Sequence, residues 1–189
     1  MAIVTLNNRA TNRSDTASAG QVFTATSATA ADFQAAGKIL QVVSVVPTAL
    51  VTGTGTIPYD DTIPQNSEGN EVMTLAITPT NASNKLLIVV TALISTTQAN
   101  SNTLGMALFQ DSTASALSAT NVNMPYSTSP EPCVIQHVMD AGTTSATTFK
   151  IRVGGHASGT TSFNGSNGAR RFGGVCNSSI VIMEIKVWL

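Results

Sequence analysis

The segments rich in β-branched and apolar residues are all short, and no amphipathic stretch of helical length separates them. Pro, Gly and Asn bound these segments, a pattern typical of strands that alternate with turns. Parallel strands need long crossovers that usually hold a helix, so neighbouring strands here should pair antiparallel. The sequence predicts an all-β fold, a jelly-roll-like antiparallel β-sandwich with an extended N-terminal arm. Eight strands are expected, at 38–46, 71–78, 85–95, 103–111, 133–141, 147–153, 160–163 and 178–188.

The first 37 residues differ from the rest of the chain. They consist mainly of Asn, Thr, Ser and Ala, with few bulky apolar side chains. Such a segment cannot bury enough apolar surface to offset the entropy lost on ordering. We therefore expect two parts: an N-terminal attachment arm over 1–37, and a β-sandwich for trimerisation and display over 38–189.

One local signal for a helix occurs inside the arm. Thr29 and Asp32 have the spacing of a capping box, and Gly37 follows as a helix stop. These signals predict a short helix near 30–36, with an Ala-rich spacer as the alternative because so short a helix is weak.

The strand expected at 85–95 is apolar on both faces. An antiparallel strand with one face in water alternates apolar and polar residues, whereas this one needs a cover on both sides. In an all-β chain the cover is either a second sheet or a neighbouring subunit, and a homotrimer would supply the latter. The residues that carry this expectation are Leu86, Leu87, Ile88, Val89 and Val90.

The chain is unusually poor in charge. Charged residues make up 10% and hydrophobic residues 42%, with a net charge of −1, whereas ordinary domains are about a quarter charged. A surface of hydroxyl, amide and methyl groups suits wide contacts with identical copies or with a larger particle. The lack of a basic field argues against nucleic-acid binding. No secretory signal and no apolar run long enough for a bilayer are found, so we expect no membrane insertion and synthesis in the cytoplasm.

The titratable side chains do not form a recognisable catalytic set. His137 shares a strand face with apolar residues and should be a hydrogen-bonded core histidine, whereas His156 is expected on a solvated turn. Cys133 and Cys176 fit two reduced, buried thiols, with a single disulfide left open. No Cys and His spacing matches a zinc site. We expect no enzymatic activity and no cofactor.

A long irregular segment, 48–70, should fold onto the domain because idle connections of this length are uncommon. It contains Asp60 and Asp61, which could bind calcium or cap a turn through side-chain to backbone hydrogen bonds. Glu68 and Glu71 are the nearest other acids, so the ligand count is short and we predict no metal site.

Arg170 and Arg171 form the basic pair of the β domain. Their guanidinium groups could bind a carboxylated or phosphorylated surface glycan, or acids of a partner. Contact with a neighbouring subunit or loop is the favoured alternative.

Several longer stretches of the sequence are distinctive. They are PYDDTIPQ at 58–65, AITPTNASNKL at 76–86, ALFQD at 107–111, HVMDAGTTSATTFK at 137–150, FGGV at 172–175 and SSI at 178–180. Together they resemble a domain of structural proteins of tailed bacteriophages, often described as tail fibre or tail proteins. The opening LNNRATNRSDTA at 6–17 also resembles the N-terminal arm of such proteins.

This resemblance implies a non-enzymatic virion protein. It would be a short trimeric tail fibre or tip, docked on the virion by an arm that includes Arg9, Arg13 and Asp15. The alternative is a capsid decoration (cement) protein that clamps neighbouring shell subunits. The implied partners are two further copies of the chain, other tail, baseplate or capsid proteins, and a glycan of the host surface.

Overall fold

The computed structural model describes residues 5–6, 9–10, 21–25, 31–35, 39–98, 103–176 and 178–187. The chain divides into two units, Met1–Lys38 and Ile39–Leu189. In the first unit the backbone forms two antiparallel pairs. These are β1 (Thr5–Leu6) with β2 (Arg9–Ala10), and β3 (Gln21–Ala25) with β4 (Ala31–Ala35).

The helix predicted near 30–36 is wrong over its described residues, because Ala31–Ala35 is the strand β4. β4 pairs with β3 over five residues, from Ala31 opposite Ala25 to Ala35 opposite Gln21. A two-turn helix leaves most of its amides and carbonyls without an intrahelical partner. Pairing with a second segment satisfies them, so the non-local partner outweighs the local capping signal.

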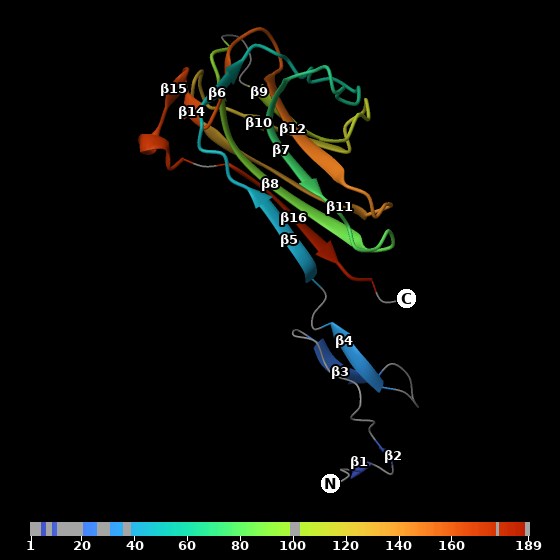
Figure 1. Cartoon of the computed structure of the whole chain (residues 1–189). Helices are drawn as coiled ribbons and strands as arrows, with labels where there is room; N and C mark the ends of the chain where they lie inside the picture. The colour runs from blue at the N-terminus through green and yellow to red at the C-terminus, as the bar shows by residue number, and fades with distance from the viewer. Residues whose placement is uncertain are drawn as a thin grey trace. The chain divides into compact units, whose positions relative to one another are not determined.

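The second unit contains two facing antiparallel sheets, shown in Figure 1. The four-stranded sheet has the order β10 (Ser118–Asn123), β9 (Thr103–Gln110), β12 (Thr147–Gly155) and β7 (Asn70–Ile77). The six-stranded sheet has the order β5 (Ile39–Val45), β16 (Ser179–Ile185), β8 (Lys85–Thr96), β13 (Thr161–Phe163) and β6 (Val51–Gly53), with β11 (Glu131–Asp140) on the other edge of β8. The predicted all-β, jelly-roll-like sandwich is confirmed.

The chain segment between β13 and β16 forms a small projection from the six-stranded sheet. It consists of the hairpin β14 (Gly165–Ser166) and β15 (Ala169–Arg170), followed by the 3₁₀ turn η1 (Phe172–Gly174). Figure 1 shows this hairpin extending from the side of the sandwich. Asn167 and Gly168 both have positive φ at its tip, as a tight hairpin turn requires. Across the described residues no helix is long and apolar enough to cross a membrane.

The core lies between the two sheets and is built from alternate residues of each strand. On β8 the inward set runs from Leu86 through Ile88 and Val90 to Ile94, all fully buried. On β12 the inward residues are Phe149, Ile151 and Val153, while Thr148, Lys150 and Arg152 point outward. Each fully buried side chain of this kind contributes about 1.5–3 kcal/mol to stability.

The long segment between β6 and β7 folds onto the outer side of the four-stranded sheet, as predicted. Ile57 is 5% exposed and packs against Ala107 and Phe109 of β9. Arg152 holds the end of the segment, since its Nε and Nη2 donate to the carbonyls of Glu68 and Gly69 at 2.6 and 2.9 Å. This cover explains how residues on the outer side of β9 are buried in a two-layer fold.

A buried carboxylate on β16 links that strand to β5 and to the turn between β7 and β8. Glu184 of β16 is fully buried and accepts hydrogen bonds from Asn84 Nδ2 at 2.5 Å, Gln41 Nε2 at 2.6 Å and Thr80 Oγ1 at 2.7 Å. The amides of Thr80 and Asn81 donate to it as well, at 2.8 and 3.3 Å. Burial acts to raise the pKa of Glu184, but the hydrogen bonds from Asn84, Gln41 and Thr80 together hold that pKa below its ordinary value.

We predict that Glu184→Gln lowers the free energy of unfolding at neutral pH by about 1–3 kcal/mol, because the new amide faces buried donors. A depressed carboxyl pKa stabilises the fold above the unfolded pKa of about 4.3, and this stabilisation is lost as pH falls through the folded pKa. Denaturant unfolding should therefore show that the free energy of unfolding falls less between neutral and acidic pH for Glu184→Gln than for the unchanged chain. Glu71→Gln is the matched control, since it removes the same charge at an exposed position, where Glu71 Oε2 lies 3.6 Å from Arg152 Nη1. An equal fall in the free energy of unfolding for the Glu184 variant and the unchanged chain would contradict a stabilising role for the Glu184 carboxylate.

Both cysteines are free, and their environments differ. Cys133 is 3% exposed, and burial raises the pKa of its thiol to about 11, whereas Cys176 is half-buried. Burial was predicted for both and is confirmed for Cys133 alone. Because the thiolate is the reactive form, we predict that a disulfide reagent at neutral pH labels Cys176 and spares Cys133, with Cys133→Ala and Cys176→Ala assigning the signal. Rapid labelling of Cys133 in the folded chain would be the contrary result, and labelling in denaturant is the positive control.

Candidate functional site

The outer side of the six-stranded sheet forms one continuous apolar surface, which we call the apolar face. One row crosses four strands in register: Val42 of β5, Met183 of β16, Leu87 of β8 and Val138 of β11. The margins are the most exposed, with Val42 at 55% and Val138 at 59%. The face consists of Ile39, Val42, Val46, Leu87, Val89, Leu93, Val134, Val138, Val181, Met183 and Ile185.

The face is electrically neutral along its length. Its charged residues are Lys85 and Asp140 at one end, and their side chains form an ion pair of 2.6 Å. The remaining positions between the apolar side chains are Ser, Thr and Gln, together with Pro132 opposite Leu93. Two such faces can therefore approach each other without repulsion between like charges.

The structure divides the predicted doubly apolar strand between two environments. Leu86, Ile88 and Val90 point into the core, where the four-stranded sheet covers them, and Leu87 and Val89 point out onto the apolar face. Apart from β14, which lies over Ser95 at one end, the described part of the unit supplies no second layer there. A monomer thus leaves this strand half covered.

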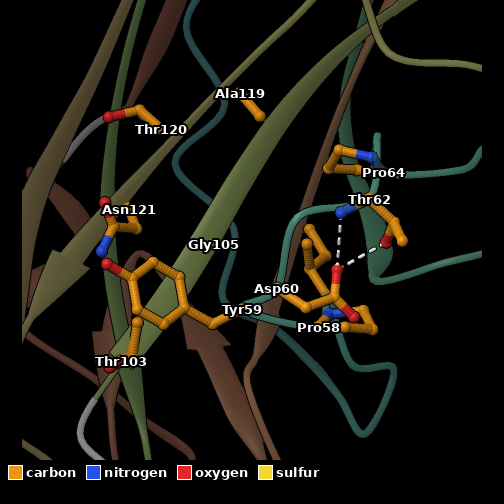
Figure 2. Close-up of a pocket in the computed structure, with 11 residues that line it drawn as sticks. Pro58, Tyr59, Asp60, Thr62, Pro64, Thr103, Gly105, Ala119, Thr120 and Asn121 are labelled. Carbon is orange, nitrogen blue, oxygen red and sulfur yellow. Dashed lines mark hydrogen bonds between the residues drawn. The ribbon is translucent and has the colours of Figure 1, made fainter.

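On the opposite sheet lies a shallow pocket of about 190 Å³, which we call the Tyr59 groove and show in Figure 2. The segment 57–64 forms one wall, and the outer side of β9 and β10 forms the floor and the other wall. Gly105 keeps the floor low, because a Cβ there would lie 3.0 Å from Ile57 Cγ2. The groups that give the groove its chemistry belong to Tyr59, Asp60, Thr62 and Asn121, around Gly105.

Tyr59 presents its ring at the groove and is held there by His156. The Tyr59 amide donates to His156 Nδ1 at 2.9 Å, and the two rings pack edge to face with centroids 6.2 Å apart. The Tyr59 side chain is nonetheless 62% exposed. His156 lies on an exposed turn as predicted, but it also fixes the groove loop, a contact between residues 97 positions apart that sequence reasoning missed.

Asp60 adopts the turn-capping role that was left open beside calcium binding. Its Oδ1 accepts from Thr62 N at 2.9 Å and from Thr62 Oγ1 at 2.5 Å. The hydrogen bond from the Thr62 side chain is the main cause that lowers the pKa of Asp60. Within the described ranges no group of three or more His, Cys, Asp or Glu side chains could hold a metal ion, and Asp61 is exposed beside the turn.

Arg170 and Arg171 lie at the end of the β14–β15 hairpin, and both are exposed. Next to them, Phe172 is 79% and Val175 is 78% exposed, the highest values among the large apolar residues of the described chain. Phe172 also has φ +48°, which is costly for an aromatic residue. The loop thus presents two guanidinium groups and two uncovered apolar side chains.

The other predicted site residues are not brought together. His137 lies half-buried on the inner side of β11, in the six-stranded sheet, and does not line the groove. Only the backbone of Arg9 is described, in β2, and Arg13 and Asp15 fall outside the described residues. The expectation that these three residues attach the chain to a larger partner stays a prediction.

A family model, the Pgp3 C-terminal domain, matches residues 51–188, well over half of the chain. It contradicts the resemblance to tailed-phage tail fibre proteins, because the family is named for a protein of Chlamydia. The predicted tail fibre, the alternative of capsid decoration, the virion location and the attachment to a phage host are therefore wrong. The quoted stretches lie mostly in turns and strand ends, which β domains of different origin share.

No curated protein matches the chain. Among solved structures, the Eiger TNF of S. frugiperda has a TM-score of 0.47 at 11% identity, with 78% of this chain and 95% of that one covered. The C-terminal domain of the sugar-binding protein EclA has 0.34 at 12% identity, covering 65% and 74%, and infectious bursal disease virus, Gt strain, has 0.39 at 12%, covering 85% and 41%. Likenesses at this level carry no information on function or assembly. The match over 51–188 does carry the family: the chain belongs to the family of Pgp3 C-terminal domains.

Proposed function

We propose that the chain is a non-enzymatic structural module that assembles as a homotrimer through its apolar face. The carrying observation is the row formed by Val42, Met183, Leu87 and Val138, which crosses four strands of the six-stranded sheet without a second layer in the described part. Soluble monomers rarely leave so large a contiguous apolar surface in water. A further copy of the same chain fits it, because the face is neutral and free of unpaired charge.

The two margins of the face favour a ring over a two-fold pair. In a closed ring each copy uses two different patches, one toward each neighbour. On one margin, Val42 of β5 and Val46, which directly follows β5, are exposed, and on the other margin Val134 and Val138 of β11 are exposed. Both patches are thus apolar, and three copies are the smallest number that closes such a ring.

The chemistry of the titratable groups supports a structural role over catalysis. The buried Cys133 thiol has a raised pKa and so lacks the thiolate needed for nucleophilic attack. His156 Nδ1 is occupied by the Tyr59 amide, and Glu184 is saturated with donors inside the fold. Each of these groups already has a structural task.

The loop that carries Arg170 and Phe172 adds a second contact region in this proposal. Ser95 lies on the outer side of β8, and its Oγ donates to the Gly165 carbonyl at 3.1 Å, so the hairpin rises from the same side as the apolar face. A neighbouring copy that covers the face would reach Phe172 and Val175, whose exposure is costly in water. Arg170 and Arg171 then lie at the rim of the contact.

We predict that the chain has three times its monomer mass of 19.5 kDa in light scattering at micromolar concentration. Val42→Asp combined with Val138→Asp should give the monomer mass, because each ring contact would then bury uncompensated carboxylates. Ile63→Asp is the matched control, since Ile63 is 60% exposed on a loop of the opposite side. A monomer or a dimer formed by the unchanged chain would overturn the trimer.

We further predict that Phe172→Asn weakens the association by about fivefold or more, because aromatic anchors dominate interface energies. Asn tolerates positive φ, so the loop conformation is kept while the ring is lost. Tyr126→Asn is the control at a residue of similar exposure, 69%. Sedimentation equilibrium measures both, and an unchanged dissociation constant for Phe172→Asn would exclude the loop from the interface.

A further inference from the structure

The Tyr59 groove combines groups that rarely meet by chance on a surface. An aromatic ring, a carboxylate and a carboxamide surround a floor that is lowered by Gly105. Figure 2 shows Tyr59 and Asn121 on one side of this floor and Asp60 with Thr62 on the other. Ligand pockets characteristically pair an apolar or aromatic surface with a few placed polar groups.

The Tyr59 ring provides a platform that is prepared before any ligand arrives. Its π face carries negative potential, so it attracts the weakly positive C–H bonds of a flat, partly apolar ligand. The amide hydrogen bond and the edge-to-face contact with His156 already restrict the residue. The entropy cost of ordering the Tyr59 side chain when a ligand stacks on it is therefore small.

The polar groups around the ring favour a ligand rich in hydroxyl groups. Asp60 uses Oδ1 for Thr62, whereas its Oδ2 accepts no hydrogen bond from any described residue. The Asn121 carboxamide is exposed, and the described chain gives it no partner either, so a donor and an acceptor remain on offer. Neighbouring hydroxyls of one molecule can serve as donors to a carboxylate and as both donor and acceptor to an amide.

Size and charge narrow the class further. The volume of about 190 Å³ is below the roughly 300–1,000 Å³ of ordinary small-molecule pockets, so the groove itself holds about one ring of a ligand. The carboxylate of Asp60 also repels phosphate, sulfate and carboxylate groups, and the groove contains no Lys or Arg to offset it.

We propose that the Tyr59 groove binds one ring of a neutral saccharide, stacked on Tyr59 and hydrogen-bonded to Asp60 and Asn121. Leu104 and Met106 point into the core, so Gly105 and the groove lie on the outer side of the four-stranded sheet. The apolar face lies on the other sheet, and the site is therefore complete in a single chain and independent of assembly.

The test is saturation-transfer NMR of the full chain with methyl glycosides of glucose, galactose, mannose, N-acetylglucosamine and N-acetylgalactosamine. At least one should bind with a dissociation constant of about 1 mM, as expected for a single ring on a shallow site. Tyr59→Ala should weaken that binding about five- to tenfold, because the stacking platform is lost. Tyr59→Phe keeps the platform and should bind nearly as well, and Asp60→Asn should bind more weakly.

Tyr126→Ala is the matched control, since Tyr126 is equally exposed and does not line the groove. Absence of binding by all five glycosides would overturn the proposal, as would equal binding by Tyr59→Ala and the unchanged chain. Tighter binding of a sulfated or sialylated glycoside would also overturn it, because the ligand would then be anionic. If Tyr59→Ala does not fold, weaker binding by Asp60→Asn together with retained binding by Tyr59→Phe would support the proposal. Unchanged binding by Asp60→Asn would then overturn it.

Discussion

The structure depends on β8 and the pairing of its backbone along both edges. β11 pairs with one edge from Lys85 to Ile94, while β16 and then β13 pair with the other. A strand paired on both sides has no free amides to offer water, so its side chains decide its environment. Because these side chains are apolar in both directions, burial stabilises β8 on its inner face, whereas exposure to water on its outer face is costly.

The inner and outer faces of β8 are covered to different extents. Inside, the four-stranded sheet supplies a packed layer of Phe149, Ile151 and their neighbours. Outside, only the β14–β15 hairpin covers one end of the strand within the described chain. The low content of charged residues would suit the proposed assembly, since an interface between copies loses stability with every unpaired charge that it buries.

The sequence was informative where the pattern of a strand is local. The alternation of apolar and polar residues at 147–153 matches the inward and outward sides of β12. The continuous apolar run at 86–90 predicted a strand that needs a cover on both faces, and the described chain covers chiefly the inner face of β8. β10 was missed because SATNVN carries little apolar signal, and it forms only because β9 offers a complete edge in register. The helix expected near 30–36 failed for the related reason that pairing with β3 is a non-local event. Likewise, neither the contact of Tyr59 with His156 nor the donors around Glu184 could be predicted, since each joins residues about a hundred positions apart.

The placement of the groove and the apolar face on opposite sheets has a consequence for how strongly the module could hold a partner. If copies close a ring through one sheet, the other sheet of every copy remains on the outside with its groove open. Several weak sites held on one rigid body raise the local concentration for each successive contact, and their joint avidity can exceed that of a single site by orders of magnitude. A shallow, single-ring site would then suffice on a surface where its ligand is dense and would release readily where the ligand is sparse.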